Sequence, residues 1–200
     1  MVHAASEVEE RARRRLAAIA QEVLALRGPA PIPLLQPDPM PLARREALLN
    51  LFAEAAVHHM TLRELEESRR TIADAIALMD DIVDPAVIAR ASLLTGEALV
   101  ELDSPNHAKP RLEVAVRFYQ TARDAKLVAR ARLGLARALV LLEDPQGLDL
   151  LHAVRADAIA RGDLVMIGRI DAILPEAMGA DVGETVRAGY GRAVSIPPTR

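Results

Sequence analysis

The chain of 200 residues has no cysteine and no tryptophan, and only 2% of its residues are aromatic. Without cysteine there are no disulfides, no cysteine catalysis and no thiolate zinc sites, and a reducing cytosol is the matching compartment. Proteins that bind single-stranded nucleic acid stack bases on aromatic side chains, and ligand pockets are usually lined with them. The scarcity of aromatics therefore argues against both functions.

A strong charge of one sign and a long apolar run are also missing. The net charge is −3 and the isoelectric point is near 6.0, so no basic field attracts nucleic acid or anionic lipid. No stretch approaches the roughly 20 apolar residues of a membrane span, and acids and arginines stand at the N-terminus where a signal peptide has an apolar run. We expect a cytoplasmic protein without a membrane partner. Its basic residues are nearly all arginine, which together with abundant alanine suggests a bacterial origin.

Aliphatic residues supply most of the 51% hydrophobic content, and helical patterns run through the chain, so the fold class we expect is all-α. The first segment, residues 1–27, reads as one helix that begins at Ser6, where Glu9 completes a capping box. Its apolar residues form a narrow seam at Ala5, Ala12, Leu16, Ile19, Val23 and Leu26. Two roles stay open for this helix: it caps the rest of the chain, or it pairs with a second copy in a homodimer.

Proline and glycine divide the remainder. Residues 28–41 contain six prolines, which predicts an extended, semi-rigid connector. Residues 42–174 form the helical domain, and residues 175–200, with several glycines and a Pro-Pro pair, read as a flexible tail. We expect this tail to fold on a partner or to lie in a groove of its own chain.

Within the helical domain, turn signals separate the helices. We expect a first helix over residues 42–60 and a second that starts with Thr61 as N-cap, with Glu64 completing another capping box, and reaches Asp81. The next helix starts with Asp84 as N-cap and Pro85 at the first helical position.

The domain repeats itself. Residues 87–105 and 127–145 align at an offset of 40 without a gap, and nine of the 19 positions are identical. Each of these two helices ends in an acidic turn with proline, at Pro105 and Pro145, and a second helix follows each turn. The start of the unit recurs at residues 160–165 with one residue deleted, ahead of a last helix that ends near Leu174. Matched turns at a fixed period are typical of stacked helix pairs.

These residues resemble the tetratricopeptide family in its longer variety, with units near 40 residues. The resemblance covers about residues 42–174 and rests on the Ala-Leu-Val runs, the Asp-Pro turns, and small residues at helix contacts such as Ala91, Gly96, Ala131 and Gly134. It departs from the family in that Phe118 and Tyr119 lie in a second helix, and the first helices lack a bulky aromatic. The resemblance implies a solenoid whose first helices line a concave groove for a peptide or helix of a partner protein.

Charges that recur in register are the candidate partner-binding residues. Arg90 and Arg130 hold one repeat position, and Glu97 and Arg137 hold another with opposite signs. Arginine suits the bidentate capture of carboxylates, so Arg90, Arg130 and Arg137 could take acids of the partner in the groove. The alternative is that Glu97 and Arg137 pair with each other across neighbouring repeats.

The remaining motifs give weaker evidence of function. Asp80, Asp81 and Asp84 match the spacing with which all-α isoprenoid synthases hold magnesium, but Asp84 starts the next helix and no second acidic motif follows. His58 and His59 are adjacent, so they point apart on a helix. Arg11, Arg13, Arg14 and Arg15 form a basic cluster, and the first three stand four residues after Glu7, Glu9 and Glu10, which predicts ion pairs on a solvated helix face. No phosphate loop, catalytic triad or dinucleotide fingerprint is present, so we expect no metal, no cofactor and no enzyme.

The function we favour from the sequence is a scaffold or adaptor that binds a segment of a partner protein in the groove. A regulatory module that senses a small ligand or peptide is the alternative. A magnesium enzyme that uses Asp80, Asp81 and Asp84 is the third reading.

Overall fold

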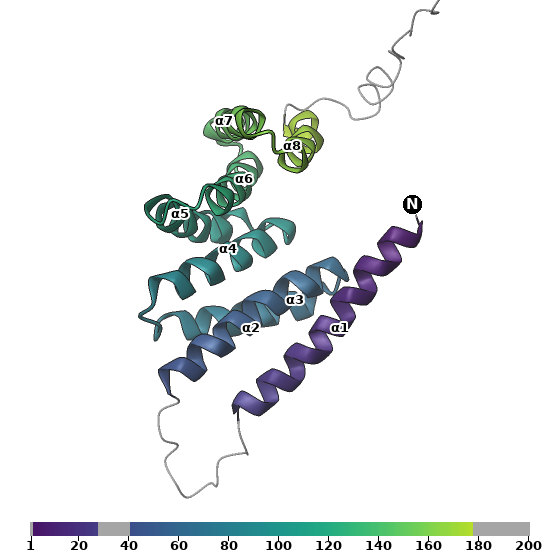
Figure 1. The fold of residues 1–200 in the computed structure, drawn as a ribbon, viewed down its shortest axis with the longest axis vertical. Coiled ribbons are helices and arrows are strands. Elements are labelled where there is room, and N and C mark those ends of the chain that lie inside the picture. Colours follow the sequence, from purple (N-terminus) through teal and green to yellow (C-terminus); the bar gives the residue numbers. More distant parts are fainter. Residues whose placement is uncertain (1, 28–40, 178–200) are drawn as a thin grey trace, which may run out of the picture.

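The structure is a computed structural model, and it describes residues 2–27 and 41–177. These residues form eight α-helices: α1 (Val2–Arg27), α2 (Leu42–Thr61), α3 (Leu65–Met79), α4 (Pro85–Glu101), α5 (Pro105–Thr121), α6 (Ala125–Leu141), α7 (Gln146–Arg161) and α8 (Leu164–Ala177). Each helix packs on its neighbour in the chain, and the pairs stack in chain order (Figure 1). The all-α architecture of repeated helix pairs is therefore confirmed.

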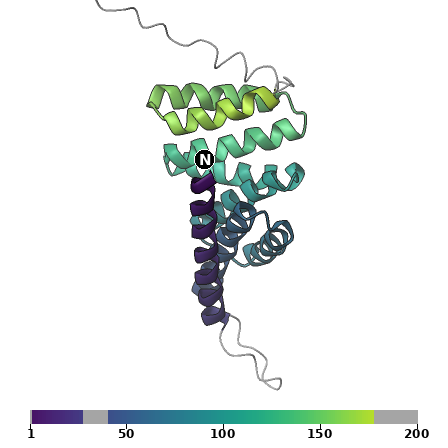
Figure 2. The same cartoon turned by 90° about the vertical axis from the view of Figure 1, so that its right-hand side faces the viewer.

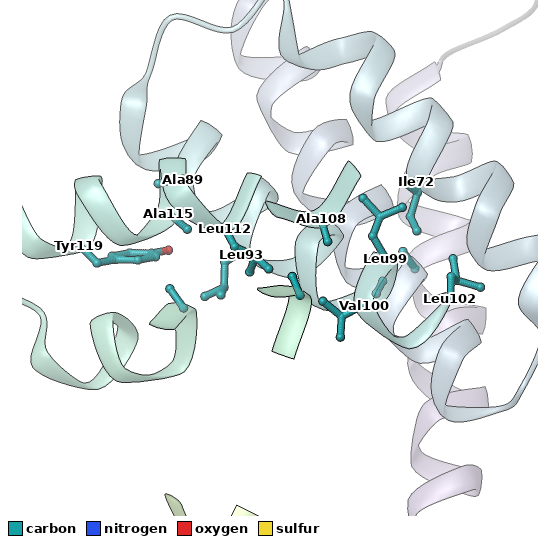
Figure 3. Close-up of a cluster of buried hydrophobic side chains, with 14 residues drawn as sticks. Ile72, Ala89, Leu93, Leu99, Val100, Leu102, Ala108, Leu112, Ala115 and Tyr119 are labelled. Atoms are coloured by element: carbon teal, nitrogen blue, oxygen red, sulfur yellow. The ribbon is translucent and has the colours of Figure 1, made fainter. Parts of the chain in front are cut away.

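Two kinds of contact build the stack. Within a unit, α2 packs on α3, α4 on α5, and α6 on α7. Between units, α2 contacts α4, α4 contacts α6, and α5 also packs on α6. The first helices of the units thus form one layer and the second helices another. The main hydrophobic cluster joins α4, α5 and α6 with parts of α2 and α3, so no helix pair has a core of its own (Figure 3).

Close packing in this cluster depends on small residues. Leu112 of α5 is fully buried, and a Cβ placed on Gly96 of α4 would lie 2.7 Å from its Cγ. A Cβ on Gly134 of α6 would lie 2.9 Å from Leu112 Cδ2. The two glycines make room for one leucine, which lets three helices approach closely.

One turn geometry recurs at nearly constant spacing. Arg63, Asp103, Arg123, Glu143 and Gly162 all have positive φ, between 53° and 68°. After each, a backbone N–H donates to a carbonyl five residues earlier, as Asp124 N does to Tyr119 O at 3.1 Å, which is the Schellman ending of a helix. The turn between α3 and α4 is different: residue 83, where the spacing would place the left-handed residue, is a β-branched valine, a type that avoids this region.

Several expected helix ends are correct and several are wrong. Asp84 caps α4 by accepting from Ala86 N at 2.8 Å, with Pro85 at the first position, as predicted. Thr61 is not an N-cap, because it is the last residue of α2 and its Oγ1 donates to Val57 O at 3.0 Å. Ser6 lies inside α1, since Ala4 and Ala5 before it are strong helix formers that continue the helix.

The N-terminal helix α1 packs on α2 (Figure 1) and, seen after a 90° turn, runs along the stack (Figure 2). Its seam residues Leu16, Ile19, Val23 and Leu26 contact Leu51 and Ala55 of α2. Arg15 adds a bidentate ion pair, Nε to Glu54 Oε1 at 2.7 Å and Nη2 to Glu54 Oε2 at 2.9 Å. In this structure the seam is therefore covered by the same chain.

At the other end, α8 covers α7 through Met166 and Ile170. Its first turn exposes Leu164 and Val165, and the charged Arg169 and Asp171 are exposed further along the helix. α8 continues to Ala177, three residues past the predicted end of the helical domain at Leu174. The proline-rich connector, apart from Pro41, and residues 178–200 of the predicted tail lie outside the described residues.

Candidate functional site

An open groove of about 880 Å³ crosses the layer of first helices. All of its lining residues come from α2, α4, α6 and α8, the first helices of successive units. Its apolar part is made by Val57, Met60, Ala98, Val100, Leu133, Ala172 and Ile173. Its charged residues are Glu97, Glu101, Lys126, Arg130, Arg137 and Arg169. A groove that spans every unit and combines an apolar strip with charged groups suits an elongated ligand.

Two ion pairs join α4 and α6 in this groove. Arg130 donates from Nε to Glu97 Oε1 at 2.7 Å and from Nη2 to Glu97 Oε2 at 2.5 Å. Arg137 Nη1 donates to Glu101 Oε1. The hydrogen bond to Glu97 raises the pKa of Arg130. The Arg130–Glu97 pair constrains how α4 and α6 are aligned, since a bidentate guanidinium–carboxylate contact is directional.

The sequence candidates are partly brought together. Glu97, Arg130 and Arg137 all line the groove, whereas Arg90 is exposed on α4 and does not line it. The expected pairing of Glu97 with Arg137 is wrong: Glu97 pairs with Arg130, and Arg137 takes Glu101 one turn further along α4. The stagger between α4 and α6, which the sequence does not reveal, decides these partners.

The helix caps reveal one groove residue that the sequence analysis missed. Asp84, Asp124 and Asp163 each accept a hydrogen bond from the first turn of the helix they precede, from Ala86, Leu127 and Met166 N respectively. Six residues after each aspartate stands an arginine: Arg90, Arg130 and Arg169. We call these three residues the arginine ladder. One residue is deleted before α8, so the 40-residue offset does not lead to Arg169, the third member of the ladder. Counting six residues from the capping Asp163 finds it.

Arg90 and Arg130 both act on Tyr119 of α5. Burial raises the pKa of Tyr119 on α5, while the charges of Arg90 and Arg130 act in the opposite direction. Both guanidinium groups therefore lie within electrostatic range of one hydroxyl. Among the residues that the structure describes, Arg90 and Arg169 have no carboxylate within ion-pair distance, in contrast to Arg130.

The other motifs serve the fold. Asp80 and Asp81 follow the end of α3, Asp84 caps α4, and Asp81 pairs with Arg45 at 3.0 Å, so the three carboxylates do not share a helix face. Within residues 2–27 and 41–177, no three His, Cys, Asp or Glu groups are arranged to hold a metal ion. His59 Nδ1 lies 2.7 Å from Glu64 Oε2.

On α1, the predicted pairs of Arg13 with Glu9 and of Arg14 with Glu10 are present on an exposed face. Arg15 instead reaches Glu54 of α2, as well as Glu22 of its own helix. This helix is therefore attached by a charge contact that local sequence spacing could not predict.

Comparison with protein-family models, with curated protein sequences and with solved structures finds no match. The comparisons identify no family, and the fold stands on the geometry described above. Among the helices of the described residues, none is long and apolar enough to cross a membrane.

Proposed function

We propose that this protein is a cytoplasmic scaffold or adaptor of the tetratricopeptide kind that binds a segment of a partner protein in the groove across α2, α4, α6 and α8. One observation carries the proposal: every lining residue of the groove comes from a first helix, and every unit contributes. Stacked first helices offer an elongated surface of this kind to extended ligands.

The apolar strip supplies affinity and the charged groups supply orientation. Contact with Met60, Val100 and Leu133 removes apolar surface of the partner from water, at roughly 25 cal/mol per Å². Charged residues on either side select the partner's register, because a misplaced like charge is costly. The proposed role involves no catalytic step. The helix α1, seated on α2, acts in this proposal as the cap of the first unit.

The test fills the groove without touching the core. Thr61 and Ala172 line opposite ends of the groove, and both are exposed. The double variant T61W/A172W narrows the groove, and A156W on the exposed side of α7 is the matched control. We expect proteins that co-purify with the tagged full chain from its native host to be lost with T61W/A172W and retained with A156W. Equal recovery with both variants, after circular dichroism confirms folding, refutes groove binding.

A further inference from the structure

We infer that a second pocket, on the side of α6 that faces away from the groove, binds the phosphate group of a phosphorylated ligand through Arg123, Arg132 and Arg161. The pocket has a volume of about 270 Å³ and lies between α5, α6 and α7. Arg132 stands two residues after the groove residue Arg130, so the two side chains leave α6 about 200° apart. The inference therefore goes beyond the proposed function and does not depend on it.

The size of the pocket suits one compact chemical group. Its apolar part is formed by Val128 and Ala129 of α6 and by Val154 of α7, and the last two are buried. Pockets for whole drug-sized ligands measure about 300–1,000 Å³. This pocket is slightly smaller, so it accommodates a phosphate group and the few atoms next to it.

The charge of the pocket differs from that of the chain as a whole. Its charged residues are Arg123, Arg132, Arg161 and Asp157, a surplus of two positive charges, whereas the whole chain has a net charge of −3. A phosphate monoester carries about −1.5 to −2 charges at pH 7 and has three strong acceptor oxygens. A carboxylate has one charge and two oxygens. Three guanidinium groups therefore match a phosphate better, both in charge and in the number of donors.

Most donors of these arginines are unused. Among the residues that the structure describes, Arg123 and Arg161 have no carboxylate within ion-pair distance. Arg132 makes one long contact, from Nη1 to Asp157 Oδ2 at 3.5 Å, and its Nε and Nη2 have no partner in the same part of the chain. A phosphate can thus be bound without breaking a strong internal contact.

Helix packing does not require arginine at these three positions. One unit earlier, at an offset of 40, the same positions hold Val83, Ser92 and Thr121. A cation at the end of α5 or α7 offsets the helix dipole, which gives Arg123 and Arg161 a local role. Arg132 lies in the middle of α6, where this effect is absent. A shared anionic ligand accounts for all three arginines.

The experiment measures binding to the purified full chain in a phosphate-free buffer with about 0.15 M chloride, where remote charge effects are screened. Inorganic phosphate is titrated by calorimetry. A fluorescent peptide of neutral residues with one phosphoserine is compared by anisotropy with the same peptide carrying serine. We expect the phosphorylated form to bind at least tenfold more tightly than the unmodified form.

The two phosphate probes distinguish the source of the ligand. If inorganic phosphate binds as tightly as the phosphopeptide or more tightly, the ligand is a small phosphate. If the phosphopeptide binds at least tenfold more tightly than inorganic phosphate, the ligand is a phosphorylated side chain of a partner protein.

Substitutions locate the site. Arg123→Gln and Arg161→Gln, both at exposed positions, should each weaken phosphate binding about fivefold. Arg117→Gln removes an equal charge from an exposed position of α5 outside the pocket, and this matched control should leave binding unchanged. Asp157→Asn should strengthen binding about twofold to threefold, because it removes the negative charge of the pocket. Such a gain cannot result from misfolding.

Three results would overturn the inference. The first is that neither phosphate probe binds the wild-type chain. The second is that Arg117→Gln weakens binding as much as Arg123→Gln, which would make the effect one of overall charge. The third is that Asp157→Asn binds phosphate no more tightly than the wild-type chain. T61W/A172W should leave phosphate binding intact, so groove binding and phosphate binding are judged by separate experiments.

Discussion

The centre of the stack and the joint between α1 and α2 are held together by different means. At the centre, Leu112 is fully buried in a notch made by Gly96 and Gly134, and the surrounding cluster draws on several helices. At the joint, a small cluster around Ile19 is supplemented by the Arg15–Glu54 ion pair and by Arg27 over the ring of Phe52 at 5.7 Å. Shape holds the centre, whereas the joint combines a thin apolar seam with charge.

This difference predicts how the stability of each region responds to a substitution. The notch around Leu112 has no spare volume, so it couples α4, α5 and α6. A substitution there is therefore expected to destabilise the whole stack. The joint involves one helix and one neighbour, so its loss stays local. The experiments below test this contrast in order of expected effect.

The largest effect is expected for Leu112→Ala. Removal of a fully buried leucine lowers the free energy of unfolding by about 3–5 kcal/mol, since the cavity cannot collapse between rigid helices. Urea denaturation followed by circular dichroism measures the loss. In the matched variant Ile19→Ala, hydrogen exchange should accelerate in α1 alone. If Ile19→Ala also loosened α4–α6, the joint and the centre would be one cooperative unit.

The pH dependence of the joint comes next. The hydrogen bond from Arg15 lowers the pKa of Glu54 below its ordinary value of 4.5. The contact therefore stabilises the docked α1 above pH 4.5, and this stabilisation is lost as the pH falls through the pKa of folded Glu54. Because both side chains are partly exposed, we expect an effect of about 1 kcal/mol.

Hydrogen exchange of α1 between about pH 6 and pH 3, corrected for intrinsic rates, measures this effect. In Glu54→Gln the extra opening of α1 at low pH should be absent, because that side chain does not titrate. If α1 opens equally at low pH in the wild-type chain and in Glu54→Gln, the Arg15–Glu54 ion pair does not stabilise the joint.

The smallest effect concerns the left-handed turns that recur along the stack. Arg123 has a φ of 58°, a region that costs a residue with a Cβ about 1 kcal/mol, while Gly162 fills the equivalent position with a φ of 68°. Arg123→Gly should raise the free energy of unfolding by about 0.5–1 kcal/mol, and Gly162→Ala should lower it by a similar amount. Thermal denaturation of the two variants measures both. Shifts of the same sign would contradict the shared geometry.

The sequence predicted the features that depend on periodicity and on caps. The helix pairs and the cap at Asp84 followed from the 40-residue offset and from local hydrogen-bonding side chains. The start of α3 was misplaced because the left-handed residue of the turn before it is Arg63, and an arginine does not mark a turn as a glycine does.

The candidate site was predicted only in part, because it depends on how the helices are placed against one another. Because α4 and α6 are staggered, Glu97 pairs with Arg130. Because α1 packs on α2, Arg15 pairs with Glu54, a residue 39 positions away. Arg169 was missed for another reason, since one deleted residue shifted its register. Position within a repeat was readable from the sequence, and contact between repeats was not.

The recurring turn predicts where this protein can be lengthened by duplication of a repeat. Asp84 and Asp124 both cap a first helix, so residues 85–124 begin just after one cap and end on the next. A tandem copy of these 40 residues placed after Asp124 would meet the same cap and the same left-handed turn at each junction. Duplication would then lengthen the layer of first helices by one helix and one arginine, while the existing contacts on either side kept their geometry.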